Sequence, residues 1–224
     1  MNRLFNPDAP IMHLLSKIAM SIYLNALWMI CCIPIVTIGA STTALFYVSQ
    51  KLVKNEEGHP TQNFFHSFRA NLKQATGIWL ILLAVGLVLG VDAYALYHLR
   101  FSNAFWTVLT AVFIVALAAY VIVLLYIFPL LAHFDNTTGA MFRNSLIIGM
   151  HFLLCTVLMA AVYAAMVFLI IRIFTPAFLL GMGVCALLCS YLLSGILRQM
   201  EGSDPEGSSS SSNSSDGNTE DENR

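Results

Sequence analysis

The chain has 224 residues, of which 58% are hydrophobic and 10% are charged, with a formal net charge of −1 and a mean hydropathy of +0.75. Soluble domains carry about 25% charged residues, and a soluble fold this poor in charge could not cover its own surface. The composition therefore excludes an ordinary soluble protein and indicates an integral membrane protein, with the lipid bilayer as its first partner. Outside residues 54–74 there is no basic stripe with interleaved aromatic residues, so no nucleic-acid partner is expected.

The small net charge is the sum of two parts of the chain that differ in composition. Residues 1–200 are apolar and net basic, and are predicted to form one transmembrane helical domain. Residues 201–224 are rich in Ser, Asp, Glu, Asn and Gly and carry almost no apolar side chain. Such a segment cannot bury enough surface to fold, so a disordered, acidic, cytoplasmic tail is expected.

The first apolar run extends from Lys17 to about residue 53 without another charged residue before Lys51. At ~1.5 Å per residue it is too long for one crossing of a ~30 Å hydrocarbon core, and it exceeds the ~7–15 apolar residues of a signal peptide. Pro34 and Gly39 lie in the middle of the run and favour a break. We therefore predict two helices, over residues 17–33 and 37–53, retained in the mature chain.

The next stretch, residues 54–74, is hydrophilic but amphipathic. Phe64, Phe65 and Phe68 fall on one helical face, and Arg69 and Lys73 lie mostly on the other. This pattern favours a helix lying flat at the membrane surface. The alternative is a face that docks onto a cytoplasmic partner.

Four further apolar spans follow, at residues 75–97, 104–131, 144–171 and 175–197. Each is long enough to cross a bilayer and carries little or no charge. The fold class is therefore predicted to be all-α, a polytopic transmembrane bundle of six helical segments.

The distribution of Lys and Arg sets the expected topology. With six crossings, eight cations outside the tail fall on one side and two on the other; with five crossings the counts are six and four. The positive-inside rule then favours six crossings with both termini in the cytoplasm. The weak point is residues 37–53, which rise only about 25 Å as a helix. Five crossings plus a re-entrant or interfacial helix is the alternative.

The most distinctive motif surrounds the first break. It comprises a mid-span amide, an indole, the two helix breakers and three hydroxyls: Asn25, Trp28, Pro34, Thr37, Gly39, Ser41 and Thr42. A buried amide in hydrocarbon is costly without partners, so Asn25 is expected to face the bundle or a cavity. The hydroxyls can bond backbone groups freed by the break. Two interpretations follow, a hydroxyl-capped turn or a broken helix that lines a transport site.

Signatures of catalysis are missing from the sequence. There is no GxSxG, HExxH or Walker motif, and no Cys–His spacing typical of zinc. We therefore expect neither an enzyme nor a cofactor or metal. Asp92 is an isolated acid late in its span, where it can hydrate or pair with Arg100, and it does not by itself indicate a proton relay.

Three stretches carry a resemblance to a known family: Asn-Ala-Leu-Trp at 25–28, Pro-Ile-Val-Thr-Ile-Gly-Ala-Ser-Thr-Thr-Ala-Leu at 34–45, and residues 64–74 with Phe68, Arg69, Asn71, Lys73 and Gln74. They resemble the YesL family, bacterial membrane proteins built on domain of unknown function 624, over roughly residues 1–200. The resemblance implies a multi-pass protein of the bacterial cell membrane. It also implies a non-enzymatic accessory role in carbohydrate transport or utilisation, with a sugar transporter or sensor subunit as partner. It supplies no established catalytic or binding residue.

Two other functions compete with that expectation. The chain can be a transporter or channel itself, with its site at the break between residues 34 and 39. It can also be a membrane scaffold that recruits a cytoplasmic partner through Phe64, Phe65, Phe68, Arg69 and Lys73.

Overall fold

The computed structural model describes residues 10–56, 58–98, 104–134, 136–172 and 177–201, with the backbone alone at 10–15, 104–105, 170, 177–180 and 196–201. Every regular element in these residues is helical, which confirms the predicted all-α class. The elements in chain order are α1 (Pro10–Cys31), the 3₁₀ turn η1 (Ile35–Thr37), α2 (Ile38–Val53), α3 (Pro60–His98), α4 (Ala104–Leu131), α5 (Thr138–His151), α6 (Leu153–Arg172) and α7 (Ala177–Glu201). The predicted tail lies outside the described residues.

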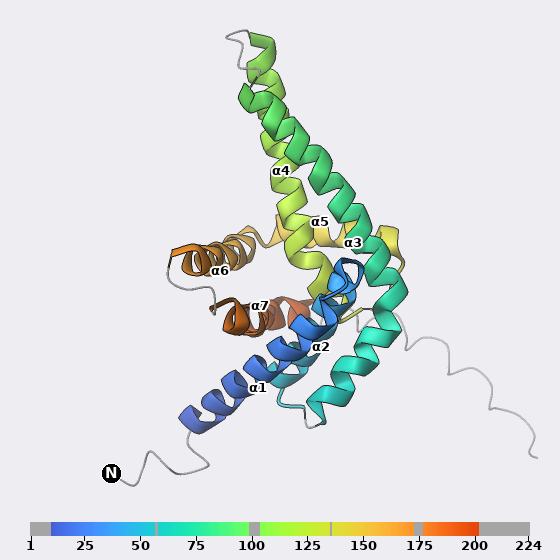
Figure 1. Ribbon diagram of the computed structural model, residues 1–224, viewed down its shortest axis with the longest axis vertical. Helices are drawn as coiled ribbons and strands as arrows, with labels where there is room; N and C mark the ends of the chain where they lie inside the picture. The colour runs from blue at the N-terminus through green and yellow to red at the C-terminus, as the bar shows by residue number, and fades with distance from the viewer. Residues whose placement is uncertain (1–9, 57, 99–103, 135, 173–176, 202–224) are drawn as a thin grey trace, which may run out of the picture.

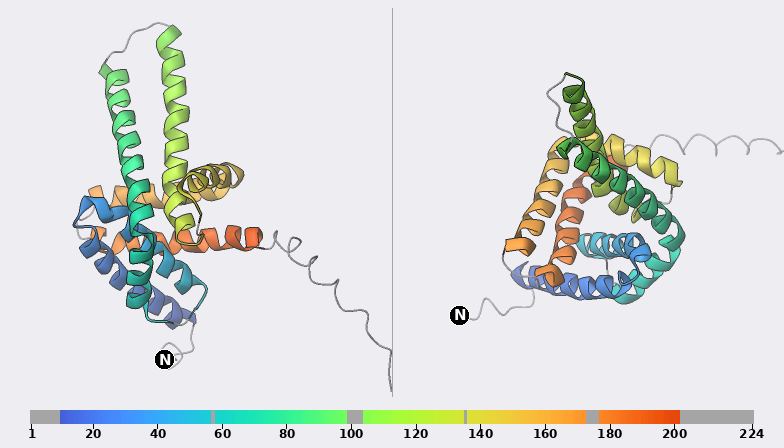
Figure 2. Two further views of the ribbon diagram at one scale, coloured as in Figure 1. Left: turned by 90° about the vertical axis from the view of Figure 1, so that its right-hand side faces the viewer. Right: turned by 45° about the horizontal axis from the view of Figure 1, so that its top comes forward.

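Two long helices, α3 and α4, form a hairpin that rises from the rest of the molecule (Figure 1, Figure 2). Its 39-residue arm α3 extends about 58 Å and its 28-residue arm α4 about 42 Å, at the usual helical rise. Both exceed a ~30 Å hydrocarbon core. The upper part of the hairpin touches little besides itself.

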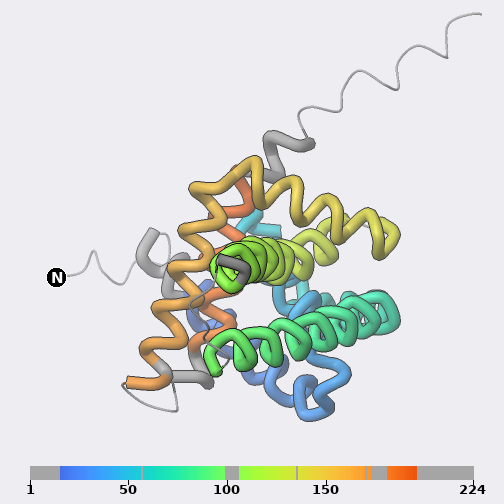
Figure 3. Tube along the Cα trace, turned by 90° about the horizontal axis from the view of Figure 1, so that it is seen from above, coloured from blue at the N-terminus to red at the C-terminus, as the bar shows by residue number. Residues whose placement is uncertain are grey.

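The other helices form a base that crosses the lower end of the hairpin. Viewed from above, α4 is seen nearly end-on while α5 and α6 lie across the view (Figure 3). Within the base, α2 packs against α3 and α7, and α7 also packs against α1 and α6. The core at this crossing holds fully buried side chains, among them Leu24 of α1, Leu45 of α2, Ile78 of α3 and Tyr126 of α4.

Polar side chains tie the base to the hairpin. Gln50 of α2 donates from Nε2 to the carbonyl oxygen of Pro129 in α4, at 2.9 Å and buried. Gln74 of α3 donates to the carbonyl oxygen of Asn136, at 2.6 Å. The last turn of α2 leads into Asn55, whose φ of 54° is the left-handed conformation common after helix ends.

Within the described residues, two helices are long and apolar enough to cross a membrane: α3 and, in α4, Trp106–Leu131. If α5 and α6 together count as one broken span, they form a third candidate membrane span. The apolar parts of α1 and α7, Ser16–Cys31 and Gly181–Gly195, are shorter, and α2 has 16 residues. The structure therefore supports an apolar helical membrane protein and does not confirm six crossings.

The predicted single helix over residues 144–171 is wrong. The chain bends by 100° between α5 and α6, at Phe152, whose φ of −110° and ψ of 55° are not helical. A side chain on Gly149 would collide with Ile122 and press on the Tyr126 ring of α4. The close passage of α4 at this glycine is the feature that accompanies the bend.

The amphipathic stretch after residue 54 also differs from its prediction as a separate surface helix. Residues 60–74 are the first turns of α3, continuous with the span that follows. Gly77 lies where the amphipathic stretch meets the apolar span, and it does not interrupt α3. A single glycine costs a helix only about 1 kcal/mol, and both flanking stretches are helical in pattern, so they merge.

Candidate functional site

The chain reverses direction between α1 and α2 through a compact turn at the predicted break. The Cys32 amide still bonds the Trp28 carbonyl at 2.9 Å, after which Pro34 cannot continue the α1 ladder and the 3₁₀ turn η1 begins. Ile33 is 79% exposed, and Pro34 is exposed beside it. The outer edge of the turn therefore lies on the surface, and its inner edge faces the core.

Hydroxyl groups on the inner side of this turn bond nearby backbone carbonyls. Thr37 Oγ1 lies 2.7 Å from the Cys31 carbonyl oxygen and 2.8 Å from that of Pro34. Ser41 donates to the Thr37 carbonyl at 3.0 Å, and Thr42 donates to that of Ile38 at 2.7 Å. The Thr37 contacts cap carbonyls at the break, as hydroxyls do in broken membrane helices. The Ser41 and Thr42 bonds instead run back to carbonyls four residues earlier, in the first turn of α2.

Small residues let the surrounding helices approach this turn closely. A Cβ on Gly39 would lie 2.5 Å from the Ala75 carbonyl oxygen and 2.7 Å from Trp79 Cβ, so α3 packs directly on the α2 backbone. A Cβ on Gly183 of α7 would collide with the α1 backbone at Ser21 and lie 3.1 Å from Asn25 Cβ. Asn25 is fully buried at this contact of α1 with α7.

Beneath the turn lies a cavity of about 390 Å³ whose lining comes from six helices. Trp28 and Thr42 bring two motif residues to its wall, and the indole Nε1 of Trp28 donates to Thr42 Oγ1 at 3.2 Å. Opposite walls are apolar or aromatic and include Trp79, Phe128, Tyr163 and Met182. The cavity is the place where the motif meets α4, α6 and α7.

Three of these aromatic residues, Trp79, Phe128 and Tyr163, are not among the candidates that the sequence predicts. Trp79 Nε1 donates to the Ile35 carbonyl at 2.9 Å, which fastens α3 to η1, and its ring lies 6.3 Å from that of Phe128. Phe128 and Tyr163 come from helices far away in the chain, so no local pattern links them to the motif. A lone Trp within an otherwise aliphatic span was the one available signal.

The cavity is suited to an apolar group. Its walls offer few polar atoms, and the Trp28 indole and the Thr42 hydroxyl are bonded to each other. A sugar would need several hydrogen-bond partners on entering such a site. Among the described residues, no three His, Cys, Asp or Glu side chains come together in a metal-binding group.

The structure brings most of the predicted motif together. Asn25, Gly39, Ser41 and Thr42 are buried around the cavity or the turn, Trp28 lines the cavity, and Thr37 is half-buried at the cap. Pro34 lies apart from them, exposed on the outer edge of the turn.

Packing within the protein buries one part of the predicted docking face on α3 and leaves the other part exposed. Phe64 is fully buried, and Phe68, half-buried, is stacked at 6.4 Å from it. Phe65 remains 39% exposed, and Arg69 and Lys73 are exposed. Phe64 is therefore part of the core, and only the other side of α3 is open to a partner.

A second polar cluster holds the bend between α5 and α6. Thr156 Oγ1 donates to the Gly149 carbonyl oxygen at 2.8 Å and lies 3.0 Å from the Tyr126 hydroxyl of α4. Tyr126 is fully buried and Thr156 is 7% exposed. One hydroxyl thus joins both sides of the bend to the hairpin.

Comparison with known proteins finds a family that matches this region. Residues 21–93, from the middle of α1 to late α3, match the family described as "Protein of unknown function, DUF624". The chain is also 25% identical over 152 residues to the "Uncharacterized protein YteU" of Bacillus subtilis (strain 168), covering 66% of this chain and 67% of that protein. No solved structure matches.

Proposed function

We propose that this chain, which belongs to the DUF624 family, is a non-enzymatic accessory protein of a bacterial carbohydrate transport or utilisation system. The match over residues 21–93 confirms the family that the N-terminal motif predicts. The accessory role and its carbohydrate context come from the family resemblance. In this proposal the α3–α4 hairpin lies in the cell membrane and contacts the helices of a transporter or sensor subunit.

The uncovered surface of the hairpin carries the proposal. In the most apolar 18-residue windows of α3 and α4, only 11% and 6% of the residues are buried by the rest of the chain. Leu87 is 64% exposed and Val115 70%. Two helices that mostly face outward cannot enclose a polar path, so their apolar surface suits lipid and the helices of another membrane protein.

A transporter with its site at the α1–α2 break is the second candidate, and the cavity beneath the turn favours it. The chemistry of the cavity points to an apolar ligand, because its walls are apolar and the motif hydroxyls bond their own backbone. We rank this function below the accessory role because a carbohydrate would find few hydrogen-bond partners there.

A scaffold for a soluble partner is the third candidate. Its face is reduced to Phe65, Arg69 and Lys73, because Phe64 and most of Phe68 are occupied within the protein. Of these three side chains only Phe65 is a large apolar group, and interface energy usually comes from buried aromatic anchors.

Membrane orientation is part of the proposal. Lys51, Lys54, Arg69 and Lys73 lie near the base end of the hairpin, and the positive-inside rule places such cations in the cytoplasm. Both termini are then cytoplasmic if the number of crossings is even. Reporter fusions at each end test this orientation, and opposite compartments would contradict it.

Photocrosslinking in native membranes tests the accessory role. A photoreactive residue at position 87 or 115 samples the exposed hairpin, and one at position 65 samples the side of α3 near the base. We expect positions 87 and 115 to crosslink to a membrane subunit of a carbohydrate permease, identified by mass spectrometry. Position 65 serves as the matched control on the same helix as position 87.

Other crosslinking outcomes separate the candidates. Crosslinks from 87 and 115 to lipid alone would contradict the accessory role, and uptake by the purified chain in liposomes would favour the transporter. A soluble protein captured from position 65 alone would favour the scaffold.

A further inference from the structure

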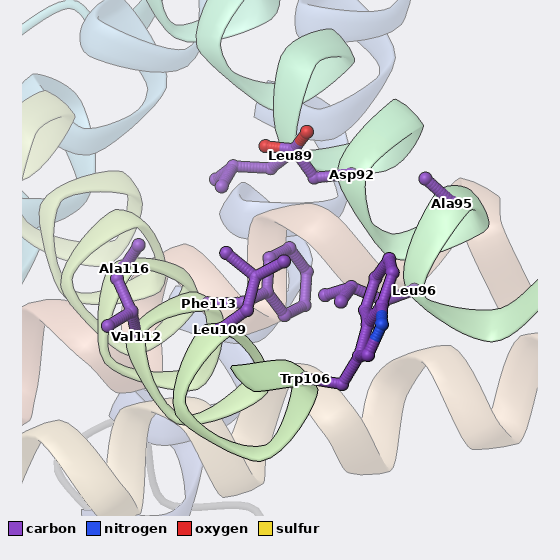
Figure 4. A pocket seen from close by; sticks show the side chains of 9 residues that line it. All are labelled: Leu89, Asp92, Ala95, Leu96, Trp106, Leu109, Val112, Phe113 and Ala116. Carbon is purple, nitrogen blue, oxygen red and sulfur yellow. The ribbon is translucent and has the colours of Figure 1, made fainter. Parts of the chain in front are cut away.

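Near the free end of the hairpin, α3 and α4 enclose a recess of about 290 Å³ that the motif does not reach. Figure 4 shows Asp92 and Leu89 of α3 across this recess from Leu109 and Phe113 of α4, with Trp106 at one side. Except for Asp92, the side chains that form its walls are apolar or aromatic. The recess therefore combines one carboxylate with an apolar groove and two aromatic rings.

The exposed aromatic residues around the recess indicate how deep it lies in the membrane. Tyr94 is 67% exposed and Tyr97 76% exposed, and both lie in the last turn or so of α3, which ends at His98. Trp106 lies in the first turn of α4. Tyr and Trp concentrate at the level of the lipid headgroups, and Asp92 lies about 9 Å along the helix from the α3 end. The recess thus opens where headgroups meet acyl chains.

Asp92 is the single acidic residue in the sequences of α3 and α4. Within the described part of the chain no basic side chain lies in ion-pairing range of it. An acid at this depth in an apolar surface is costly and is a functional candidate by default. It requires a cation from its surroundings.

We propose that this recess binds a phospholipid with a primary ammonium headgroup, of the phosphatidylethanolamine type. Asp92 accepts charge-assisted hydrogen bonds from the ammonium group. Phe113 offers a ring face to the cation or to the first carbons of the lipid, and Trp106 lines the same recess. An acyl chain lies along the apolar groove beside Leu89 and Leu109. This site goes beyond the proposed function, since it requires no partner protein.

Native mass spectrometry of the purified full chain tests the proposal. The chain is titrated in detergent with phosphatidylethanolamine, phosphatidylcholine and phosphatidylglycerol of identical acyl chains. We expect phosphatidylethanolamine to bind most strongly, because only its headgroup has both a positive charge and N–H donors. Asp92→Asn keeps the shape of the side chain and should weaken phosphatidylethanolamine binding about ten-fold.

Val91→Asn is the matched control variant. Val91 is 68% exposed on the same helix at nearly the same depth, and it does not line the recess. The control should bind phosphatidylethanolamine like the unmodified chain. Soluble phosphoethanolamine should not displace the lipid, because it lacks the acyl chain that fills the groove.

Thermal unfolding distinguishes a lipid site from an internal ion pair. We expect Asp92→Asn to unfold at the same temperature as the unmodified chain without lipid, and to lose the stabilisation that phosphatidylethanolamine adds. A lower unfolding temperature without lipid would mean that Asp92 pairs within the chain, for example with Arg100, and would overturn the proposal. Equal binding of phosphatidylglycerol, an equal loss in Val91→Asn, or displacement by phosphoethanolamine would overturn it as well.

Discussion

The upper α3–α4 hairpin and the α1–α2 turn are both built from apolar sequence, yet they meet their surroundings in opposite ways. On the hairpin, large side chains such as Leu87 and Val115 point outward. At the turn, Ala40, Ala44 and Leu45 are fully buried, and the neighbouring hydroxyls bond the backbone. The hairpin exposes its apolar side chains, whereas the turn buries them.

The two regions therefore place different requirements on their sequences. The hairpin needs length and apolarity, since lipid tolerates many shapes of side chain. The turn needs particular shapes, because a packed interior responds to a change of even one methylene group. Identical substitutions should therefore have very different effects in the two regions.

The largest effect is expected from Gly39→Leu. Its Cβ would lie 2.5 Å from the Ala75 carbonyl oxygen and 2.7 Å from Trp79 Cβ, so α2 and α3 must separate. Overpacking of this kind lowers the free energy of unfolding by about 3 kcal/mol, as chemical unfolding in detergent would measure. Gly90→Leu is the control, because apart from the adjoining backbone of α3 nothing in the structure lies within 4 Å of a Cβ at that position. Equal stability of the two variants would contradict the close packing at Gly39.

A pair of leucines on one helix gives an effect of similar size. Leu82 is 2% exposed and Leu87 is 64% exposed, both on α3. Leu82→Ala leaves a cavity and should lower the free energy of unfolding by about 3 kcal/mol. Leu87→Ala should lower it by less than about 0.5 kcal/mol. Similar losses for both variants would show that another chain covers the hairpin under the conditions of the measurement.

A smaller effect is expected from Thr156→Val at the bend. The substitution removes the donor to the Gly149 carbonyl and the partner of the buried Tyr126 hydroxyl. Leaving such groups unbonded costs about 2 kcal/mol. Thr110→Val, which removes an exposed contact to the Trp106 carbonyl, is the control and should be nearly neutral. Adding Tyr126→Phe to Thr156→Val should recover part of the loss, and no recovery would argue against the Tyr126–Thr156 bond.

The sequence predicts the hairpin better than the base for a physical reason. Residues 104–131 form α4 with the predicted bounds, because a long uncharged run offers one solution, a helix. The α1–α2 break was equally visible, since Pro34 and Gly39 act locally. Even there, the choice between a capped turn and an open site depended on where Thr37, Ser41 and Thr42 found acceptors.

Tertiary contacts decided the features that local patterns missed. The bend at Phe152 lies in a mostly apolar run without Pro, and it accompanies the close contact of Gly149 with α4. The cavity joins Trp79, Phe128 and Tyr163 across three helices. The burial of Phe64 depends on packing that an amphipathic pattern does not reveal. An apolar helical face can meet lipid or protein equally well, so its pattern does not identify its neighbour.

Spin-label accessibility tests the central claim, that the hairpin lies in lipid, most directly. Single cysteines at positions 65, 87 and 115, in a chain whose five native cysteines are replaced, are labelled and reconstituted in bilayers. We predict that labels at 87 and 115 collide often with oxygen and rarely with a water-soluble nickel complex, and that the label at 65 is the more accessible to nickel. Labels at 87 and 115 as accessible to nickel as the label at 65 would contradict the account.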